Sequence, residues 1–323
     1  MLTRRNLLAA SAAWLAASDG ARAQADWPNK PVKVIVTYPP GGGADTTARI
    51  LFQKLSEMWG RSFVIDNRGG AGGTIGAAIA AKAEPDGYTI MHDATAFSVN
   101  PALYPNLSFD YSKDFVPVFL ASLVPNILVV TPSVEAKTVT DIVELAKRTP
   151  GGLDFASSGN GTLQHLCLEL LKFQAKIPIN HIPYRGGALA LNDIVAGQVK
   201  YAFANGSSSI GLVQGGKVKA IAHTGKGRLG NLPDLPAMLD TFPGFETYEW
   251  NGVLVPAGTS PEIVRKLNAG LNEVLRQPDI VARFKSLNIE FKANTPDEFR
   301  TFIATETAMG GKVVREAGIK LGG

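Results

Sequence analysis

Short apolar runs alternate with helical patterns along almost the whole chain. The runs lie at 32–36, 63–65, 88–91, 127–131, 153–156, 179–182, 201–203 and 220–222. This alternation predicts an α/β fold with mostly parallel sheets, because parallel strands need a crossover, usually helical, to join them. Three helix starts are also visible: Thr138 with Asp141 resembles a capping box, and Ser260-Pro261 and Thr295-Pro296 place a capping side chain before proline.

The N-terminus has the pattern of an export signal. Arg4 and Arg5 precede a short apolar, small-residue run that ends at Ala21-Arg22-Ala23, an A-x-A site. The Thr-Arg-Arg-x-Leu-Leu core is similar to a twin-arginine signal. We therefore expect residues 1–23 to be removed near Ala23 and the rest to reach the periplasm; a buried N-terminal helix is the alternative.

Composition excludes several classes of function. The chain has 32 basic and 28 acidic residues, a net charge of +4, and no run of Lys and Arg, so nothing supports binding to nucleic acid or a membrane surface. The single cysteine, Cys167, cannot form an internal disulfide, and the four histidines lack the paired spacing of a zinc site. No nucleophile elbow, Walker loop or dinucleotide fingerprint is present. We expect no metal, no cofactor and no catalytic residue.

Glycine-rich or serine-rich turns follow five of the predicted strands. They lie at 38–49, 66–76, 157–162, 183–187 and 205–209. A helix that begins at such a turn presents free backbone N–H groups and the positive end of its dipole, which together favour an anion. In an open α/β sheet, ligands bind beyond the carboxyl ends of the strands. The turns therefore predict an anion site, with plain connections as the alternative for each.

Two segments, 121–130 and 248–258, look like crossovers between domains. If both are hinge strands, residues 24–124 and 250–323 form one domain, residues 125–249 form the other, and the cleft between them holds the ligand. Arg185 is the one strong charge available for a carboxylate, or else a solvated side chain. Asp45 is expected to cap the helix after the first glycine turn rather than to meet the ligand.

These motifs together resemble the Bug family, the substrate-binding proteins of tripartite tricarboxylate transporters. The resemblance covers essentially the whole chain after the signal and is carried by residues 38–49, 67–77, 85–88, 100–104, 158–165, 183–186 and 250–258. It implies a two-domain, type II Venus-flytrap periplasmic binding protein with two interdomain crossovers. Such a protein is expected to be a monomer that delivers a small carboxylate to membrane permease subunits.

The resemblance also implies which residues contact the ligand. Family members hold a ligand carboxylate through glycine loops of the first domain, often by bridging waters, and close the second domain over the rest. Carried over to this sequence, the contacts are Tyr38, Gly42, Gly43, Ala94 and Thr95 in the first domain and Ser158, Asn160, Thr162, Arg185 and Asn205 in the second.

Two positions depart from the family pattern. Ala204-Asn205 stands where many relatives have Asp, and Gly69 stands where Pro is usual. The first departure removes an acceptor for an amino or hydroxyl group, so we expect a simple, aromatic or dicarboxylate ligand rather than an amino acid.

Two other functions remain open from the sequence. One is an exported α/β enzyme acting on a carboxylate or phosphate ester through the serines at 157–158 or 207–209. The other is a ligand-dependent sensor that uses the same site and differs only in its partner protein.

Overall fold

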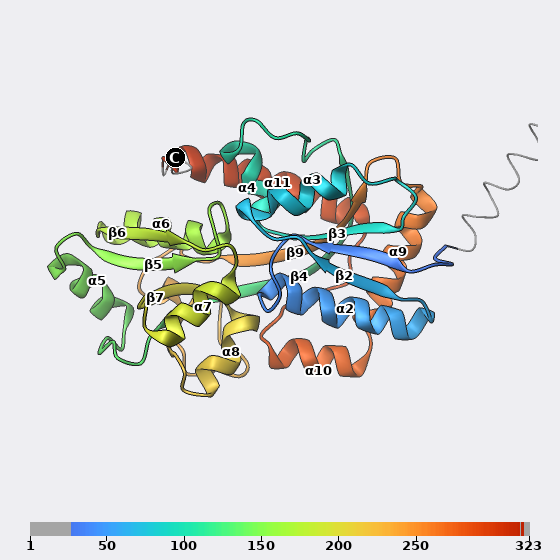
Figure 1. Cartoon of the computed structure of the whole chain (residues 1–323). Coiled ribbons are helices and arrows are strands. Elements are labelled where there is room, and N and C mark those ends of the chain that lie inside the picture. Colours follow the sequence, from blue (N-terminus) through green and yellow to red (C-terminus); the bar gives the residue numbers. More distant parts are fainter. Residues whose placement is uncertain (1–26, 317, 320–323) are drawn as a thin grey trace, which may run out of the picture.

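The computed structural model describes residues 27–316 and 318–319, and the predicted export signal lies outside them. None of the helices in this described part has both the length and the apolar character that a bilayer crossing requires. The α/β alternation is confirmed, and Figure 1 shows the elements gathered into two lobes.

One mixed sheet runs through both lobes. Its strands are β1 (Val32–Val36), β2 (Phe63–Asn67), β3 (Thr89–Ala94), β4 (Phe115–Val130), β5 (Leu153–Ser157), β6 (Ile179–Pro183), β7 (Tyr201–Asn205), β8 (Lys219–His223) and β9 (Tyr248–Pro256). The order is β2-β1-β3-β9-β4-β7-β5-β6, with β8 also paired to β4. Strands β1, β2 and β3 are parallel to one another, as are β5, β6 and β7, while β4 and β9 run antiparallel to their neighbours.

The long strands β4 and β9 connect the lobes (Figure 1). They pair from Phe115 opposite Pro256 to Pro125 opposite Tyr248, and beyond Pro125 strand β4 pairs with β7 and β8 instead. This change of partner lies beside the predicted domain boundary at 124/125, although the boundaries themselves stay a prediction. Both predicted crossovers thus lie in extended, mutually paired strands.

Ten α-helices and two short 3-10 turns cover the sheet in the described residues. They are α2 (Gly43–Trp59), α3 (Thr74–Ala81), α4 (Ala96–Leu103), α5 (Val139–Arg148), α6 (Leu163–Ala175), α7 (Gly187–Ala196), α8 (Gly206–Gln214), α9 (Pro261–Val274), α10 (Pro278–Ser286), α11 (Pro296–Glu316), η1 (Ala71–Gly73) and η2 (Met238–Asp240). The three predicted helix starts are confirmed: Thr138 forms a capping box with Asp141, and Ser260 and Thr295 accept hydrogen bonds from the first turns that follow them.

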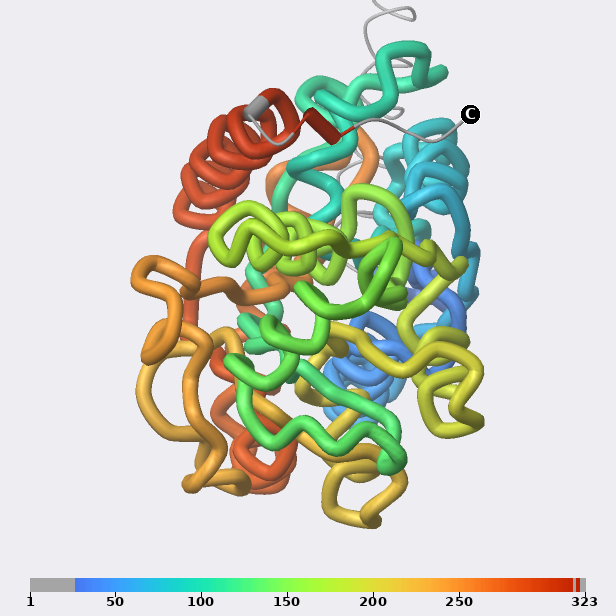
Figure 2. Tube along the Cα trace, turned by 90° about the vertical axis from the view of Figure 1, so that its left-hand side faces the viewer, coloured from blue at the N-terminus to red at the C-terminus, as the bar shows by residue number. Residues whose placement is uncertain are grey.

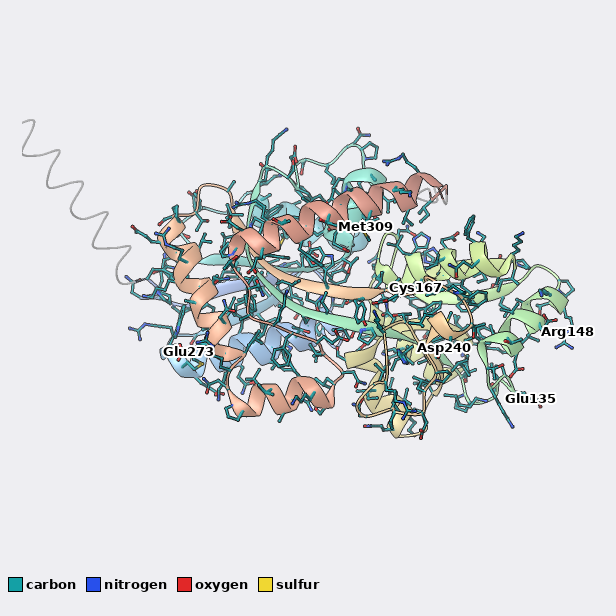
Figure 3. All side chains as sticks on the ribbon, turned by 180° about the vertical axis from the view of Figure 1, so that it is seen from behind. Glu135, Arg148, Cys167, Asp240, Glu273 and Met309 are labelled. Carbon is teal, nitrogen blue, oxygen red and sulfur yellow. The ribbon has the colours of Figure 1, made fainter. Side chains whose placement is uncertain are left out.

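We call the lobe with β1–β3, α2–α4 and α9–α11 the first lobe, and the lobe with β5–β8 and α5–α8 the second. Each has its own buried apolar core, centred on Phe52 and Leu55 in the first and on Phe155 and Leu168 in the second. Figure 2 looks onto the second lobe, with the first behind it. In Figure 3, Glu135 and Arg148 mark the outer end of the second lobe, whereas buried Cys167 lies at its inner end.

Candidate functional site

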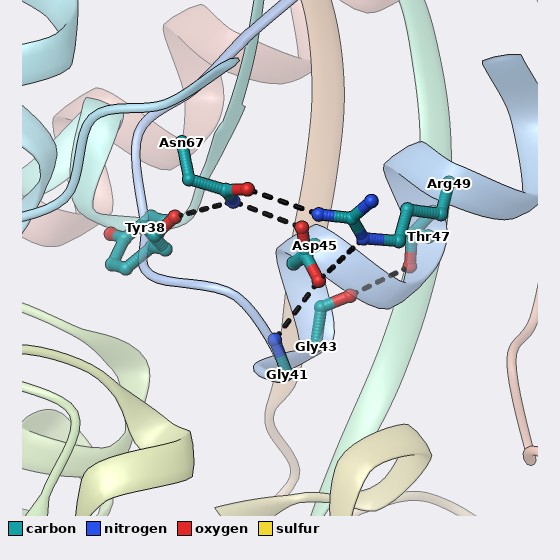
Figure 4. Close-up of polar contacts among 7 residues, drawn as sticks. All are labelled: Tyr38, Gly41, Gly43, Asp45, Thr47, Arg49 and Asn67. Atoms are coloured by element: carbon teal, nitrogen blue, oxygen red, sulfur yellow. Dashed lines mark hydrogen bonds and ion pairs between the residues drawn. The ribbon is translucent and has the colours of Figure 1, made fainter. Parts of the chain in front are cut away.

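The first glycine turn is held rigid by the carboxylate of Asp45 (Figure 4). Its Oδ2 accepts hydrogen bonds from the backbone N–H of Gly41 and from Nε of Arg49, both at 2.9 Å, and its Oδ1 accepts one from Nδ2 of Asn67 at 2.9 Å. Burial favours the neutral acid, but these hydrogen bonds outweigh burial and lower the pKa of Asp45. The prediction that Asp45 caps the helix is wrong: Gly42 is the N-cap of α2, and Asp45 is the third helical residue, whose carboxylate holds the turn from within the helix.

The second lobe meets this turn at Asn205, the N-cap of α8. The Oδ1 atom of Asn205 accepts hydrogen bonds from the backbone N–H of Ser207 at 3.0 Å and from its hydroxyl at 2.6 Å. Gly43 packs so closely against this side chain that a Cβ on Gly43 would stand 2.4 Å from Cγ of Asn205. The lobes are therefore closed on each other, and a glycine permits the contact.

A cavity of about 30 Å³ lies beside the contact between Gly43 and Asn205, and both residues line it. It accommodates on the order of two waters. Its wall is formed by Tyr38, Gly42, Gly43, Ala44, Ala94, Thr95, Ala96, Ser158, Thr162, Leu163, Gln164, Gly187, Ala190, Leu191, Ala202, Phe203, Ala204, Asn205, Ser208 and Glu249. An organic acid with several carbons needs more room than this. Uptake of such a ligand therefore requires the lobes to separate or the wall to shift.

Five helices from both lobes begin at this cavity. First-turn residues of α2, α4, α6, α7 and α8 all lie on its wall. The sequence predicted four of these helix starts, those of α2, α6, α7 and α8. The fifth predicted turn, 66–76, is not on the wall; α4 takes its place, and Gly72 packs instead against the backbone oxygen of Asn160. Converging N-termini concentrate N–H groups and positive dipole ends on one small space.

Eight of the ten predicted contact residues line the cavity, and two do not. Tyr38, Gly42, Gly43, Ala94, Thr95, Ser158, Thr162 and Asn205 are on the wall. The partly buried Asn160 lies outside it, where its carbonyl oxygen approaches Gly72 across the gap between the lobes. Arg185 is exposed and also off the wall, which favours the solvated side chain over the ligand contact, the two alternatives that the sequence left open.

Ser158 belongs to a chain of hydrogen-bonded polar groups along the wall, and its other members, Gln164, Asn126 and Glu249, were missed from the sequence. The hydroxyl of Ser158 donates to Oε1 of Gln164, and Nε2 of Gln164 donates to Oδ1 of Asn126 at 2.9 Å and to Oε2 of Glu249. Gln164 lies in the first turn of α6, and Glu249 is the one charged residue in the buried strand β9. A glutamate inside an apolar hinge strand was the signal that could have identified this group.

The electrostatics of the site are unusual because its ionisable groups are acids. Burial raises the pKa of Glu249, although the hydrogen bond from Nε2 of Gln164 opposes the rise. Burial also raises the pKa of Asp93 to about 7, against hydrogen bonds from Thr37 and Ala94. Burial and the nearby Asp93 and Glu249 raise the pKa of Tyr38, which stays a neutral phenol.

No Lys or Arg is among the described residues that line the cavity. An anion there would be held by backbone N–H groups, hydroxyls and amides. Likewise, no cluster of three or more potential metal ligands occurs in the part of the chain that the structure describes.

Comparison with known proteins identifies the family. The model of the tripartite tricarboxylate transporter family receptor matches residues 47–319. Protein BugT of Bordetella pertussis is 34% identical over 298 residues, which cover 91% of each chain.

Two solved structures show the same architecture with a ligand named. Rpa4515 of Rhodopseudomonas palustris, solved with adipate, is 34% identical with a TM-score of 0.89, over 91% of this chain and 99% of that one. MatC of the same organism, solved with malate, is 29% identical with a TM-score of 0.84, over 89% and 100%. The predicted two-domain periplasmic-binding-protein fold with two crossovers is thereby confirmed, and the chain belongs to the Bug family of tripartite tricarboxylate transporter receptors.

Proposed function

We propose that this protein captures a small carboxylate between its lobes and delivers it to the membrane permease subunits of a tripartite tricarboxylate transporter. The observation that carries the proposal is the convergence of five helix N-termini on one cavity whose described wall has no cationic side chain. Such a site stabilises a carboxylate through N–H groups, helix dipoles, hydroxyls and side-chain amides, with no cationic side chain. The adipate and malate of the structural neighbours support the same ligand class.

The proposed contacts follow from the wall. Gly42, Gly43 and Thr95 in the first lobe and Ser158, Thr162 and Asn205 in the second lobe present N–H, hydroxyl or amide groups to the cavity. Because both lobes contribute, ligand stabilises the closed form relative to the open one. A single chain supplies the complete cavity, so we propose that the working unit is a monomer.

A thermal-shift screen against mono-, di- and tricarboxylates tests the ligand class, with adipate and malate as the first acids. Ligand at 100 times its dissociation constant should add about 2.7 kcal/mol to the free energy of unfolding, which for a chain of this length raises the melting temperature by roughly 4 °C. The uncharged diamide of the same acid is the matched control and should produce no shift. No stabilisation by any carboxylate would refute the proposal.

The partner and the compartment need separate measurements. Pull-down of the permease subunits with and without the acid that binds separates delivery to a transporter from a sensor role with another partner. N-terminal sequencing of the exported protein should begin near Gln24 if the signal is removed as proposed. Light scattering with chromatography measures the mass expected for a monomer.

An exported enzyme is less well supported by the geometry. The hydroxyl of Ser157 lies 2.5 Å from Nε2 of His181, a contact that resembles a nucleophile with its base. However, Ser157 is buried, is absent from the cavity wall, and its hydroxyl is also hydrogen-bonded to the backbone of Gly159. The pair therefore stabilises the turn between β5 and α6. Turnover of an ester that disappears in Ser158→Ala would favour the enzyme instead.

A further inference from the structure

Glu249 is a buried acid on the wall of a cavity proposed to bind acids. Its side chain comes from β9, one of the two strands that connect the lobes, and the residue is 8% exposed. It lines the cavity together with Gln164, whose amide donates to its carboxylate, and with Asn205, whose Nδ2 has no hydrogen-bond partner among the described residues. Among the described residues, none of the ion pairs involves Glu249.

A buried carboxylate without a cation is costly unless its oxygens are fully hydrogen-bonded. Its two oxygens accept about four hydrogen bonds, and among the described residues the structure gives it one side-chain donor, Nε2 of Gln164. Glu249 lines the cavity, so a group inside the cavity can reach its carboxylate. A donor on the ligand would therefore complete the set when the lobes close.

The surroundings of Glu249 favour a donor over a second anion. Tyr38, on the same wall, is a neutral phenol because burial, Asp93 and Glu249 all raise its pKa, so it brings no positive charge to Glu249. A carboxylate of the ligand placed beside Glu249 would be repelled, whereas the helix N-termini attract it. The cavity thus has one part suited to a carboxylate and one part suited to a hydrogen-bond donor.

We infer that Glu249 is a specificity-determining residue that selects a carboxylate carrying a hydroxyl or ammonium group. The inference rests on the proposed function and narrows its ligand class. It also reverses the expectation drawn from Ala204-Asn205: the acceptor absent at the end of β7 is supplied by Glu249 from β9.

The test uses sets of acids with the same carbon skeleton and is read by titration calorimetry at pH 7.5. Succinate, malate and aspartate form one set; glutarate, 2-hydroxyglutarate and glutamate form the second; adipate, 2-hydroxyadipate and 2-aminoadipate form the third. In the set that fits the cavity, a donor-bearing acid should bind the wild type about tenfold or more tightly than the donor-free acid, the effect expected of a hydrogen bond to a charged group.

Two substitutions identify the donor. Glu249→Gln keeps an acceptor and removes the charge, so it should weaken an ammonium acid about tenfold while leaving a hydroxyl acid within about threefold. Glu249→Met removes the acceptor and should weaken both, with little change for the donor-free acid. Glu290→Gln is the matched control, because Glu290 is a carboxyl outside the cavity wall, and it should change none of the affinities.

The outcomes separate this inference from the function on which it rests. If no acid of any set or of the wider carboxylate screen binds, the proposed function fails and the inference fails with it. If acids bind but the donor-free member of each set binds as tightly as its partners, the function stands and the role of Glu249 is overturned. If circular dichroism shows that a Glu249 variant does not fold, the inference is judged from the wild type alone, by comparing its affinities for the donor-bearing and donor-free acids of each set.

Discussion

Closure of the lobes should depend on the absence of a side chain at Gly43. Gly43 is the first residue of α2, so alanine suits its backbone there and the open form tolerates it. In the closed form the added Cβ would lie 2.4 Å from Cγ of Asn205 and 2.6 Å from both Nδ2 and Oδ1. Gly43→Ala therefore penalises the closed form selectively.

The size of this penalty follows from what holds Asn205 in place. Its side chain cannot swing aside without losing the hydrogen bonds that Oδ1 accepts from the N–H and hydroxyl of Ser207. Loss of an N-cap costs about 1 kcal/mol and up to about 2 kcal/mol. The alternative is to hold the lobes apart, which gives up the contacts that Gly41 and Gly186 make with Ala188 and Pro39. Either route predicts binding weaker by roughly 5- to 30-fold.

Calorimetry with the best acid from the screen measures this loss, and small-angle scattering with saturating acid measures how far the lobes close. Gly211→Ala is the matched control, because it places the same methyl group on α8 where nothing lies within 4 Å. The reasoning is refuted if Gly43→Ala binds as tightly as Gly211→Ala and reaches the same radius of gyration.

Three further predictions concern single side chains. Asp45→Ala should lower the free energy of unfolding by about 3 kcal/mol in urea denaturation, because three donors lose their acceptor; a change below about 1 kcal/mol would contradict this role. Burial lowers the pKa of His92 to about 3, so below pH 6.5 the unfolded chain binds a proton that the folded chain does not, and stability falls. His92→Leu should therefore gain about 2 kcal/mol relative to the wild type between pH 7 and pH 5, and an equal difference at both pH values would disprove it. Arg185→Ala should change carboxylate affinity by less than about threefold in calorimetry, because Arg185 is exposed, and a tenfold loss would place it back in the site.

Local sequence patterns predicted most of the fold because they report local physics. Helix caps and apolar runs depend on neighbours in the chain, and the helix starts predicted at Thr138, Ser260 and Thr295 were confirmed. The full length of β4 was not predicted, since proline normally interrupts a strand. The structure shows how β4 accommodates both prolines: Pro117 lies at a shift of register, and Pro125 lies where β4 exchanges β9 for β7 and β8.

The contacts among side chains at the cavity were harder to predict than the turns on which those side chains lie. The glycine turns could be located because a turn between a strand and the following helix lies at the carboxyl end of that strand, where ligands bind in an open α/β sheet. The direction of a long side chain beside a Gly-Gly pair cannot be read in this way, and Arg185 lies off the wall. Glu249 and Gln164 are 85 residues apart and meet only because β9 returns to the gap between the lobes. Contacts of that kind depend on the closed tertiary structure and leave no local pattern.

The helix N-termini and Glu249 have different roles in the proposed recognition of the ligand. Backbone N–H groups at five helix starts are present whatever the side chains are, so the general affinity for carboxylates is built into the turns. Glu249 projects from a hinge strand and contacts those turns through a side chain, that of Gln164 at the start of α6, so its substitution leaves the backbone N–H groups in place. Substitution at Glu249 should therefore change the relative affinities for different acids but not abolish carboxylate binding. Substitution at Gly43 should lower the affinity for every acid by the same factor. Measuring the affinities of both variants for the whole set of acids tests this division. If both variants lower all affinities by the same factor, the site acts as a single unit.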